Sequence, residues 1–287
     1  MQVEYKENCE IKTYTTFKIG GTIKKLWLPK NQQELVYLLK TLKDYIVLGN
    51  CSNVLISSKG YSGNIILTTQ MRNFEINGSR VIVDCGVKGP FLAQKACEAS
   101  LSGFEFMIGF PGTIGGEVYM NASCFKKSMD HIVRGVICLN SDGKIIFLKD
   151  LKCGYRKTCF SENHLIILKV LLEFQNKKEN SLELLNKYQE IKRNTQPVNT
   201  YTAGSMFING INYQAWELID KLGLRGFRIN DAIISLKHTN FFVNLKNATF
   251  NEMLALIYYV KISVLINYQI DLKTEVKIIT NNSIAYS

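Results

Sequence analysis

Histidine is scarce in this chain of 287 residues, which contains only His131, His164 and His238. A nucleophilic serine usually needs an adjacent base, and so few histidines leave little choice of one. Ser205 lies in the stretch TAGSMFIN (202–209), where no glycine stands two residues before it or two residues after it. This spacing excludes the nucleophile elbow of α/β-hydrolases. Ser205 therefore needs a role other than attack on a substrate.

Signals for metal binding, secretion and membrane insertion are also lacking. None of the eight cysteines forms a C-x-x-C pair, so zinc and thioredoxin-like sites are poor interpretations and no metal site is predicted. The N-terminal stretch MQVEYKENCEIK has no apolar core like that of a signal peptide. The apolar run 254–266 carries Lys261 and is too short to span a bilayer, so we expect a core-facing helix there. These features predict a cytoplasmic protein with reduced thiols and no membrane anchor.

Acidic residues are fewer than basic ones, and the net charge is +11. The simplest interpretation is a lysine-rich solvated surface. A nucleic-acid module would cluster its charge and interleave aromatic residues, whereas here the lysines and arginines are scattered. A small phosphorylated substrate fits this pattern better than a polymer does. A basic protein that binds nucleic acid or an acidic polymer is the alternative from another class.

The hydrophobic pattern predicts helices and strands in irregular alternation, which favours an α+β fold with at least two domains. Apolar residues at helical spacing predict helices over 31–43, 91–101, 181–194, 213–223 and from about Phe250. Short apolar runs predict strands at 45–49, 53–57, 64–69, 164–174, near 231–243 and at 272–279. Hairpins are predicted at 74–86, turning at Asn77-Gly78, and at 136–148. The polar, helix-breaking stretch around 195–204 predicts a domain boundary.

Two glycine-rich loops suggest a ligand with phosphate groups. In LGNCSNVL (48–55), small residues let successive backbone N–H groups point into one concavity suited to phosphate oxygens. In GFPGTIGGEVYMNAS (109–123), four glycines would let a flat or charged ligand approach the backbone. Neither loop matches G-x-G-x-x-G or the P-loop, which argues against Rossmann and NTPase folds. Either loop alone could also be a tight turn without a ligand.

Together with five further motifs, the two loops point to a protein family far more specifically than either loop does alone. They occur in one order with YTTFKIGG (14–21), GYRKTCF (154–160), TAGSMFIN (202–209), SLKHTNFFVN (235–244) and LKTEVKII (272–279). Over nearly the whole chain they closely resemble the family of UDP-N-acetylenolpyruvoylglucosamine reductases, in its shorter subtype without an extra substrate-capping insertion. The resemblance implies a vanillyl-alcohol-oxidase-type FAD-binding fold in two subdomains, roughly 1–75 and 76–195. A C-terminal α+β substrate-binding domain, 196–287, would follow.

The resemblance also implies which residues bind FAD. Carried over by position, the expected contacts are Gly49, Asn50, Ser52, Asn53, Gly112, Thr113, Gly115 and Gly116. The flavin is expected to be held without a covalent bond, and none of the three histidines falls in the two loops. Cys51 stands where the family is expected to have glycine. If this position requires φ > 0, Cys51 bears strain.

The implied reaction is the reduction of UDP-N-acetylglucosamine enolpyruvate to UDP-N-acetylmuramate, with NADPH as co-substrate and FAD as carrier of the hydride. It belongs to peptidoglycan synthesis and so to cell-wall biogenesis, cell shape and cell division. Ser205 would give the proton, since a donor to a strongly basic carbanion needs no base beside it. Arg156 would stabilise the charge that spreads onto the substrate carboxylate, because a guanidinium binds a carboxylate at two points. Glu275 would have to be protonated or paired with Arg156.

Tyr155 and Asn209 are weaker candidates for holding the uridine diphosphate or its sugar. We predict no nucleic-acid partner, because the basic charge is scattered, and no membrane and no obligate protein partner. A different flavin oxidoreductase on the same fold, oxidising an alcohol or a sugar, is the alternative among enzymes. It would need no pair of Ser205 and Glu275.

Overall fold

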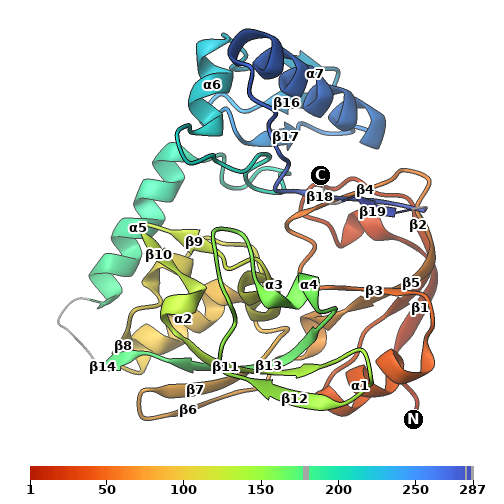
Figure 1. Cartoon of the computed structure of the whole chain (residues 1–287), viewed down its shortest axis with the longest axis vertical. Coiled ribbons are helices and arrows are strands. Elements are labelled where there is room, and N and C mark those ends of the chain that lie inside the picture. The colour runs from red at the N-terminus through yellow and green to blue at the C-terminus, as the bar shows by residue number, and fades with distance from the viewer. Residues whose placement is uncertain (177–180, 282, 286–287) are drawn as a thin grey trace. The chain divides into compact units, whose positions relative to one another are not determined.

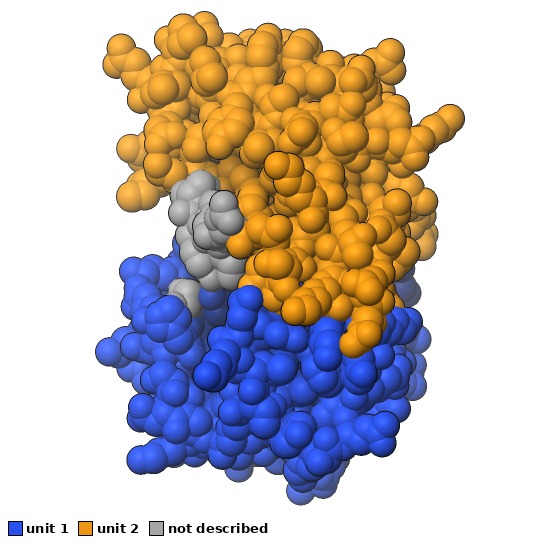
Figure 2. All heavy atoms as spheres, turned by 90° about the vertical axis from the view of Figure 1, so that its right-hand side faces the viewer, with its two compact units in different colours: residues 1–6, 25–50, 64–191 blue, residues 7–24, 51–63, 192–287 orange. Residues whose placement is uncertain are grey.

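The computed structural model describes residues 1–176, 181–281 and 283–285, and its mixture of helices and strands confirms the predicted α+β class (Figure 1). The chain forms two compact units, coloured separately in Figure 2. Unit 1 comprises residues 1–6, 25–50 and 64–191, and unit 2 comprises residues 7–24, 51–63 and 192–287.

Unit 1 is built on a five-stranded antiparallel sheet in the order β12-β11-β13-β7-β6. Its strands are β6 (Phe74–Asn77), β7 (Arg80–Asp84), β11 (Val133–Leu139), β12 (Ile145–Leu148) and β13 (Ile166–Glu173). The two predicted hairpins, β6–β7 and β11–β12, are both present. The first closes where Asn77 pairs with Arg80, and Gly78 adopts the positive φ of 58° that this tight turn requires.

One face of this sheet forms the core of unit 1. Along β7, Val81 and Val83 are buried while Ile82 between them is exposed, which is the period of two expected for a half-buried strand. The buried side chains pack with those of two helices, α2 (Gly89–Glu98) and α3 (Ile114–Tyr119). This packing positions α3 and the loop that leads into it.

A second sheet has the order β1-β2-β5-β3. Its strands are β1 (Tyr5–Glu10), β2 (Thr22–Trp27), β3 (Tyr45–Leu48) and β5 (Tyr61–Leu67), and β3 and β5 run parallel. The predicted helix before β3 is α1 (Gln32–Thr41), whose first turn is capped by the Asn31 side chain, which accepts from the Glu34 N–H. The sequence did not predict β1, because this strand is mostly exposed and lacks apolar alternation.

The remaining elements of residues 1–195 are short, apart from one helix. That helix is α5 (Ser181–Thr195). The short elements are β8 (Leu101–Ser102), β9 (Ser123–Cys124), β10 (Lys127–Ser128), α4 (Cys159–Glu162), β14 (Gln175–Asn176) and 3₁₀ turns at Ile11–Thr13, Thr68–Gln70, Glu105–Met107 and Met129–His131.

Unit 2 combines two small sheets with two helices. One sheet is antiparallel, with β15 (Arg228–Ile229), β16 (Ala232–Ile234) and β17 (Phe242–Asn244); the other has the order β19-β18-β4, with β4 (Val54–Ile56), β18 (Lys277–Thr280) and β19 (Ser283–Ala285). The helices are α6 (Ala215–Lys221) and α7 (Phe250–Tyr268). The core gathers residues from distant parts of the sequence, including Phe17, Leu55, Phe207 and Leu256.

The C-terminal strand differs from its prediction in a way that matters for Glu275. A continuous strand was expected over 272–279, but β18 begins only at Lys277 and Glu275 lies in a bend. The chain changes its pairing partner there. Before the bend it pairs with residues 206–208, through Phe207 opposite Thr274, and after it β18 runs parallel to β4. Simple alternation therefore does not set the direction of the Glu275 side chain.

The compact units also cut the chain differently from the predicted domains. Residues 7–24 and 51–63 group with the C-terminal part, because β4 pairs with β18 and because Phe17 and Leu55 lie in the same core. The predicted assignment of 1–195 to FAD and 196–287 to substrate concerns binding, and it stays a prediction.

Candidate active site

The two glycine-rich loops meet in unit 1. Asn50, which follows β3, donates a hydrogen bond from its side-chain amide to the Pro111 carbonyl oxygen over 2.6 Å. Gly49 approaches the second loop so closely that a Cβ atom at Gly49 would lie 2.2 Å from Oγ1 of Thr113. Six of the eight predicted FAD contacts belong to these unit 1 segments, whereas Ser52 and Asn53 belong to unit 2.

Thr113 carries a polar atom that the protein itself does not satisfy. The residue is 1% exposed, and within the described part of the chain its Oγ1 atom makes no hydrogen bond. A buried hydroxyl without a partner costs about 1–3 kcal/mol. A ligand oxygen would remove this cost, so the cradle formed by Gly49 and Thr113 fits a polar or anionic ligand group.

The glycines of the second loop do not all serve a ligand. A Cβ atom at Gly112 would lie 3.0 Å from Oε1 of the buried Glu117, and one at Gly115 would lie 2.8 Å from Cβ of Cys85. The Gly115 N–H also donates to the Cys85 carbonyl oxygen over 2.8 Å. Packing therefore explains Gly112 and Gly115. At Gly116 the nearest atom to an added Cβ is 3.6 Å away, which is ordinary contact, so this glycine leaves room.

Arg156 lies beside the end of the same loop. It occupies a tight turn in which the Gly154 and Lys157 backbones bond to each other, and its own φ is 56°. A non-glycine residue in this left-handed region is uncommon and is often found at functional sites. The Arg156 Nη1 donates to Oγ of Ser123 over 2.8 Å. The structure thus places the predicted charge stabiliser next to the loop that contains Thr113.

Ser205 is held by hydrogen bonds on both sides of its segment. On one side Ser205 pairs with Phe241, and the Met206 N–H donates to the Asn240 carbonyl oxygen over 2.7 Å. The Asn240 side chain, 3% exposed, both donates to the Phe207 carbonyl oxygen and accepts from the Phe207 N–H. The sequence analysis missed Asn240, and the only sign of it was its place in the motif SLKHTNFFVN.

Gly204 serves the Ser205 segment through its backbone angle. The missing side chain serves no close approach, because a Cβ atom at Gly204 would meet no described atom within 4 Å. Its φ is 81°, a conformation that side chains disfavour. Glycine is therefore required by the turn.

Glu275 lies on the other side of the Ser205 segment in unit 2. Its N–H donates to the Met206 carbonyl oxygen over 2.8 Å, and its carbonyl oxygen accepts from the Asn53 side chain over 3.1 Å. Asn53, a predicted FAD contact, thus also anchors the backbone of a predicted catalytic residue. The backbone segments that carry Ser205 and Glu275 therefore lie side by side, and a joint catalytic role of the two residues stays a prediction.

Lys277 is a charged neighbour of Glu275 that the sequence analysis missed. Burial lowers the pKa of the Lys277 ammonium, and the nearby Glu275 carboxylate acts in the opposite direction. The available signal was the closeness of Glu275 and Lys277 in the motif LKTEVKII, where they stand two residues apart. Within unit 2, Lys277 is therefore a cation that can influence the charge state of Glu275.

Comparison with known proteins places this chain in a family. Residues 196–279 match the model of the C-terminal domain of UDP-N-acetylenolpyruvoylglucosamine reductase, and residues 23–149 match an FAD-binding domain. The enzyme of that name from Caldicellulosiruptor bescii is 37% identical, with 96% of this chain and 91% of the relative covered. The chain belongs to the UDP-N-acetylenolpyruvoylglucosamine reductase family.

Two further comparisons support membership of this reductase family. The relative from Orientia tsutsugamushi strain Ikeda is 37% identical, with 98% of this chain and 96% of the relative covered. The crystal structure of UDP-N-acetylenolpyruvylglucosamine reductase from Thermus caldophilus superposes with a TM-score of 0.85 at 31% identity, covering 98% of this chain and all of that one. The predicted family and fold class are confirmed.

Cys51 of this reductase stands at a position where the family is expected to have glycine. Its backbone angle shows whether that position requires a positive φ. Its φ is 48°, so the position does require a positive angle and the side chain bears strain. Cys51 is 3% exposed, and burial raises the pKa of its thiol to about 12. The thiol is therefore neutral at physiological pH and is a poor nucleophile.

The two weaker substrate candidates occupy different settings. Tyr155 is exposed in the turn that holds Arg156, and the Arg156 Cζ atom lies 5.1 Å from its ring centroid. Asn209 uses its side-chain oxygen to accept from the Ala215 N–H at the start of α6, over 2.9 Å. The structure thus gives Asn209 a helix-capping role, and substrate binding by either residue stays a prediction.

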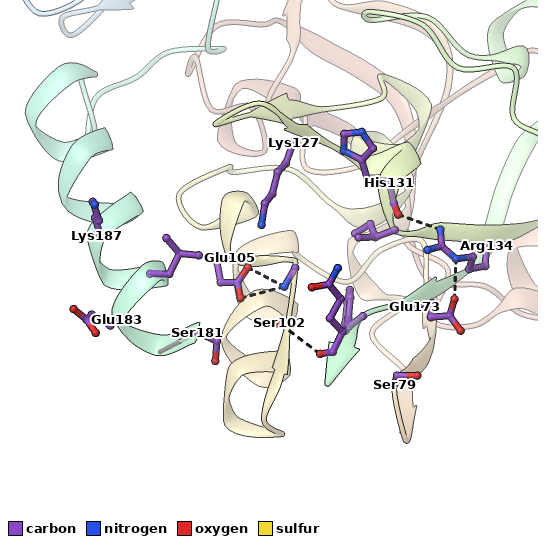
Figure 3. A pocket seen from close by; sticks show the side chains of 15 residues that line it. Ser79, Ser102, Glu105, Lys127, His131, Arg134, Glu173, Ser181, Glu183 and Lys187 are labelled. Atoms are coloured by element: carbon purple, nitrogen blue, oxygen red, sulfur yellow. Dashed lines mark hydrogen bonds and ion pairs between the residues drawn. The ribbon is translucent and has the colours of Figure 1, made fainter. Parts of the chain in front are cut away.

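Unit 1 also contains a cavity of about 820 Å³ (Figure 3). Three of its charged side chains, those of Glu105, Arg134 and Glu173, make hydrogen bonds within the protein. Glu105 accepts two hydrogen bonds from the Gly103 N–H, and Nε of Arg134 donates to Glu173 over 2.9 Å. None of the predicted site residues lines this cavity. In the described part of the chain no three His, Cys, Asp or Glu side chains gather as they would around a metal ion.

The buried histidine His238 makes the stability of unit 2 depend on pH. Burial, and next the charge of Arg225, lower the pKa of His238, and its Nδ1 accepts from the Asn240 N–H over 3.3 Å. Because the folded pKa lies below the unfolded value of about 6.5, the stability contribution is complete above that pH and is lost as pH falls through the folded pKa.

We therefore expect the melting temperature to fall on acidification from about pH 7 to pH 5, and His238→Gln to flatten part of this fall. His164→Gln is the matched control, because His164 is exposed on unit 1. Thermal melts at several pH values measure the effect. A His238→Gln profile that parallels the wild type would show that His238 does not cause it.

Proposed function

We propose that this chain reduces UDP-N-acetylglucosamine enolpyruvate to UDP-N-acetylmuramate, with NADPH as co-substrate, in the synthesis of peptidoglycan precursors. Family membership over nearly the whole length supports the substrate. The unsatisfied Thr113 hydroxyl beside Gly49 is the observation that carries the cofactor assignment, since a ligand oxygen would satisfy it. The chain is thus a flavin-dependent oxidoreductase.

FAD would be held without a covalent bond by residues of the two loops. Thr113 donates its hydroxyl to the cofactor, Gly116 leaves space for it, and Gly49 and Asn50 fix the loop that faces Thr113. Gly112 and Gly115 support FAD binding indirectly, because they let the loop pack on Glu117 and Cys85. Ser52 and Asn53 complete the set from the following segment. When bound, FAD supplies the hydride that it has received from NADPH.

The catalytic roles follow from the chemistry of the side chains. Ser205 donates its hydroxyl proton to the substrate carbon that becomes a carbanion, and Gly204 and Asn240 set its position. Arg156 binds the substrate carboxylate as a two-point fork and so stabilises the charge that spreads onto it. Glu275 assists next to Ser205, with Lys277 as its neighbouring cation. Tyr155 contributes to binding the uridine diphosphate or its sugar.

The finer partner assignments are part of this proposal. We place the reaction in the cytoplasm, where UDP-sugars and NADPH are available, and we infer no nucleic-acid partner and no obligate protein partner. Scattered basic charge then serves to attract anionic substrates rather than to bind a polymer.

The flavin content of the purified chain tests the function. We expect a yellow protein whose colour moves entirely to the small-molecule fraction after denaturation, and NADPH oxidation that depends on the enolpyruvyl sugar. Yellow colour retained on the denatured chain would contradict noncovalent binding. Absence of flavin even after reconstitution would remove the basis of the assignment.

Arg156→Lys tests the role of the guanidinium fork. The charge is kept but two-point binding is lost, so turnover should fall by about 10- to 100-fold, as expected for a lost charge-assisted hydrogen bond. Thermal stability and flavin content should stay near wild type, because lysine keeps the positive charge at this position. Lys157→Arg, one residue away and exposed, is the matched control. Near-normal turnover of Arg156→Lys would exclude the assigned role.

A further inference from the structure

Helix α7 presents an apolar face to solvent. On this helix of unit 2, at the upper part of Figure 1, Tyr258 is 54% exposed, Ile262 55% and Ile266 73%. Tyr259 and Leu265 are exposed beside them. The spacing of three, four and seven residues places Tyr258, Ile262, Leu265 and Ile266 on one side of the helix. We call Tyr258, Tyr259, Ile262, Leu265 and Ile266 the α7 stripe.

The exposed side of α7 also carries no charged residue, which is unusual for a helix face in solvent. The eight exposed residues of the helix are Asn251, Ala255, Tyr258, Tyr259, Ile262, Leu265, Ile266 and Asn267, and none of them is charged. The two charged residues of α7 are engaged elsewhere. Glu252 completes the capping box with Thr249, and Lys261 pairs with Asp271 over 3.6 Å. An exposed helix face normally carries charges, so an apolar patch of this kind marks an interaction site.

The opposite side of α7 determines how the helix can engage a partner. By length and composition, the whole of α7 is the one described helix that could cross a membrane, although the run 254–266 alone was expected to be too short. Met253, Leu256, Ile257 and Val260 on its other side are nevertheless 0–1% exposed in the core of unit 2. Insertion across a bilayer would require that core to open. The helix can therefore lie on an apolar surface but cannot span one while unit 2 stays folded.

Charge favours an anionic membrane surface as the occupant. The chain has a net charge of +11. Exposed cations lie on elements that pack against α7 or lead into it, namely Lys221 at the end of α6, Arg228 on β15 and Lys246 before the helix. In the described part of the chain, Arg228 and Lys246 make no ion pair. Tyrosines, as in the stripe, suit the headgroup level of a bilayer, and basic residues add attraction to anionic lipids.

A second copy of the chain fits the stripe less well. Five partly exposed side chains on one helix offer on the order of 500 Å². A stable dimer buries about 800 Å² on each partner. Two copies of a strongly basic chain would also repel each other.

We propose that the α7 stripe docks this protein on anionic phospholipid surfaces, with the stripe at the level of the headgroups and the flanking cations against the lipid phosphates. This inference revises the sequence-based prediction of no membrane partner. It is independent of the catalytic assignments, because none of the stripe residues belongs to the candidate active site.

Vesicle flotation of the full-length holoenzyme tests the proposal. We expect binding to vesicles that contain phosphatidylglycerol, at least fivefold weaker binding to vesicles of phosphatidylcholine alone, and weakening by salt. The double variant Ile262→Asp/Ile266→Asp should lose at least 90% of the binding. Arg228→Glu/Lys246→Glu should reduce it several-fold, since the charge is reversed while the stripe remains.

Ile211→Asp is the matched control, because Ile211 is a fully exposed isoleucine of the same unit outside α7. It should float like the wild type, and every variant should keep its flavin and its melting temperature. Failure to bind anionic vesicles, or equal binding by the Ile262→Asp/Ile266→Asp variant, would overturn the proposal. So would a concentration-dependent dimer in sedimentation that the same variant abolishes, which would assign the stripe to a second copy of the chain.

Discussion

Ser205→Ala is expected to separate the two halves of the catalytic cycle. Reduction of the bound flavin by NADPH needs no proton from the protein to a substrate carbon, so its rate should stay near that of the wild type. Reoxidation by the enolpyruvyl sugar needs that proton and should slow by roughly 10²–10⁴-fold, the range for loss of a positioned acid. Stopped-flow absorbance of the flavin measures both rates on one sample.

The setting of Ser205 makes this substitution informative. Its segment is held by backbone pairing with Phe241 and by both hydrogen bonds of Asn240, none of which involves the serine hydroxyl. Removing the hydroxyl should therefore leave the fold intact. Ser205→Cys should recover part of the lost rate, since a thiol can still donate a proton. Equal slowing of both half-reactions would indicate general damage, and unchanged reoxidation would mean that another residue gives the proton.

Thr113→Val is expected to have opposite effects on stability and on cofactor binding. Valine keeps the branched shape but removes a hydroxyl that has no partner among the described residues. The apoprotein should become equally or more stable, by up to about 1–3 kcal/mol, because a desolvation cost disappears. FAD affinity should fall by about 10- to 100-fold, because a hydrogen bond to a charged group is lost. Thermal melts of the apoprotein and fluorescence titration with FAD measure the two effects.

Thr158→Val is the matched control for the expected gain in apoprotein stability and loss of FAD affinity. Thr158 is also 1% exposed in unit 1, but its Oγ1 donates to the Tyr119 carbonyl oxygen over 2.8 Å. Its replacement should destabilise the apoprotein by about 1 kcal/mol, because it removes this hydrogen bond. If Thr113→Val destabilises the apoprotein to the same extent and leaves FAD affinity unchanged, the Thr113 hydroxyl serves the fold and not the cofactor.

The sequence by itself determined the family, the reaction class and most of the local structure of this protein. The leucines of α1 and the Asn77-Gly78 turn act through neighbours within a few residues, so their pattern is sufficient. The ordered motifs from 14–21 to 272–279 identified the enzyme family, because several sites at fixed order rarely coincide by chance. Glu275 was found through its motif, although the straight strand expected around it is bent.

Only the tertiary structure decided which distant residues meet. Gly49 lies against Thr113, the Asn240 side chain donates to the Phe207 carbonyl oxygen, and β18 pairs with β4. Each of these contacts joins segments that are far apart in the chain, and no local sequence pattern encodes such contacts. The α7 stripe shows the same limit for another reason. The helix is apolar on both sides, so its sequence has no periodicity that distinguishes the face in the core from the face in solvent. The packing of unit 2 around Met253, Leu256 and Val260 makes that choice.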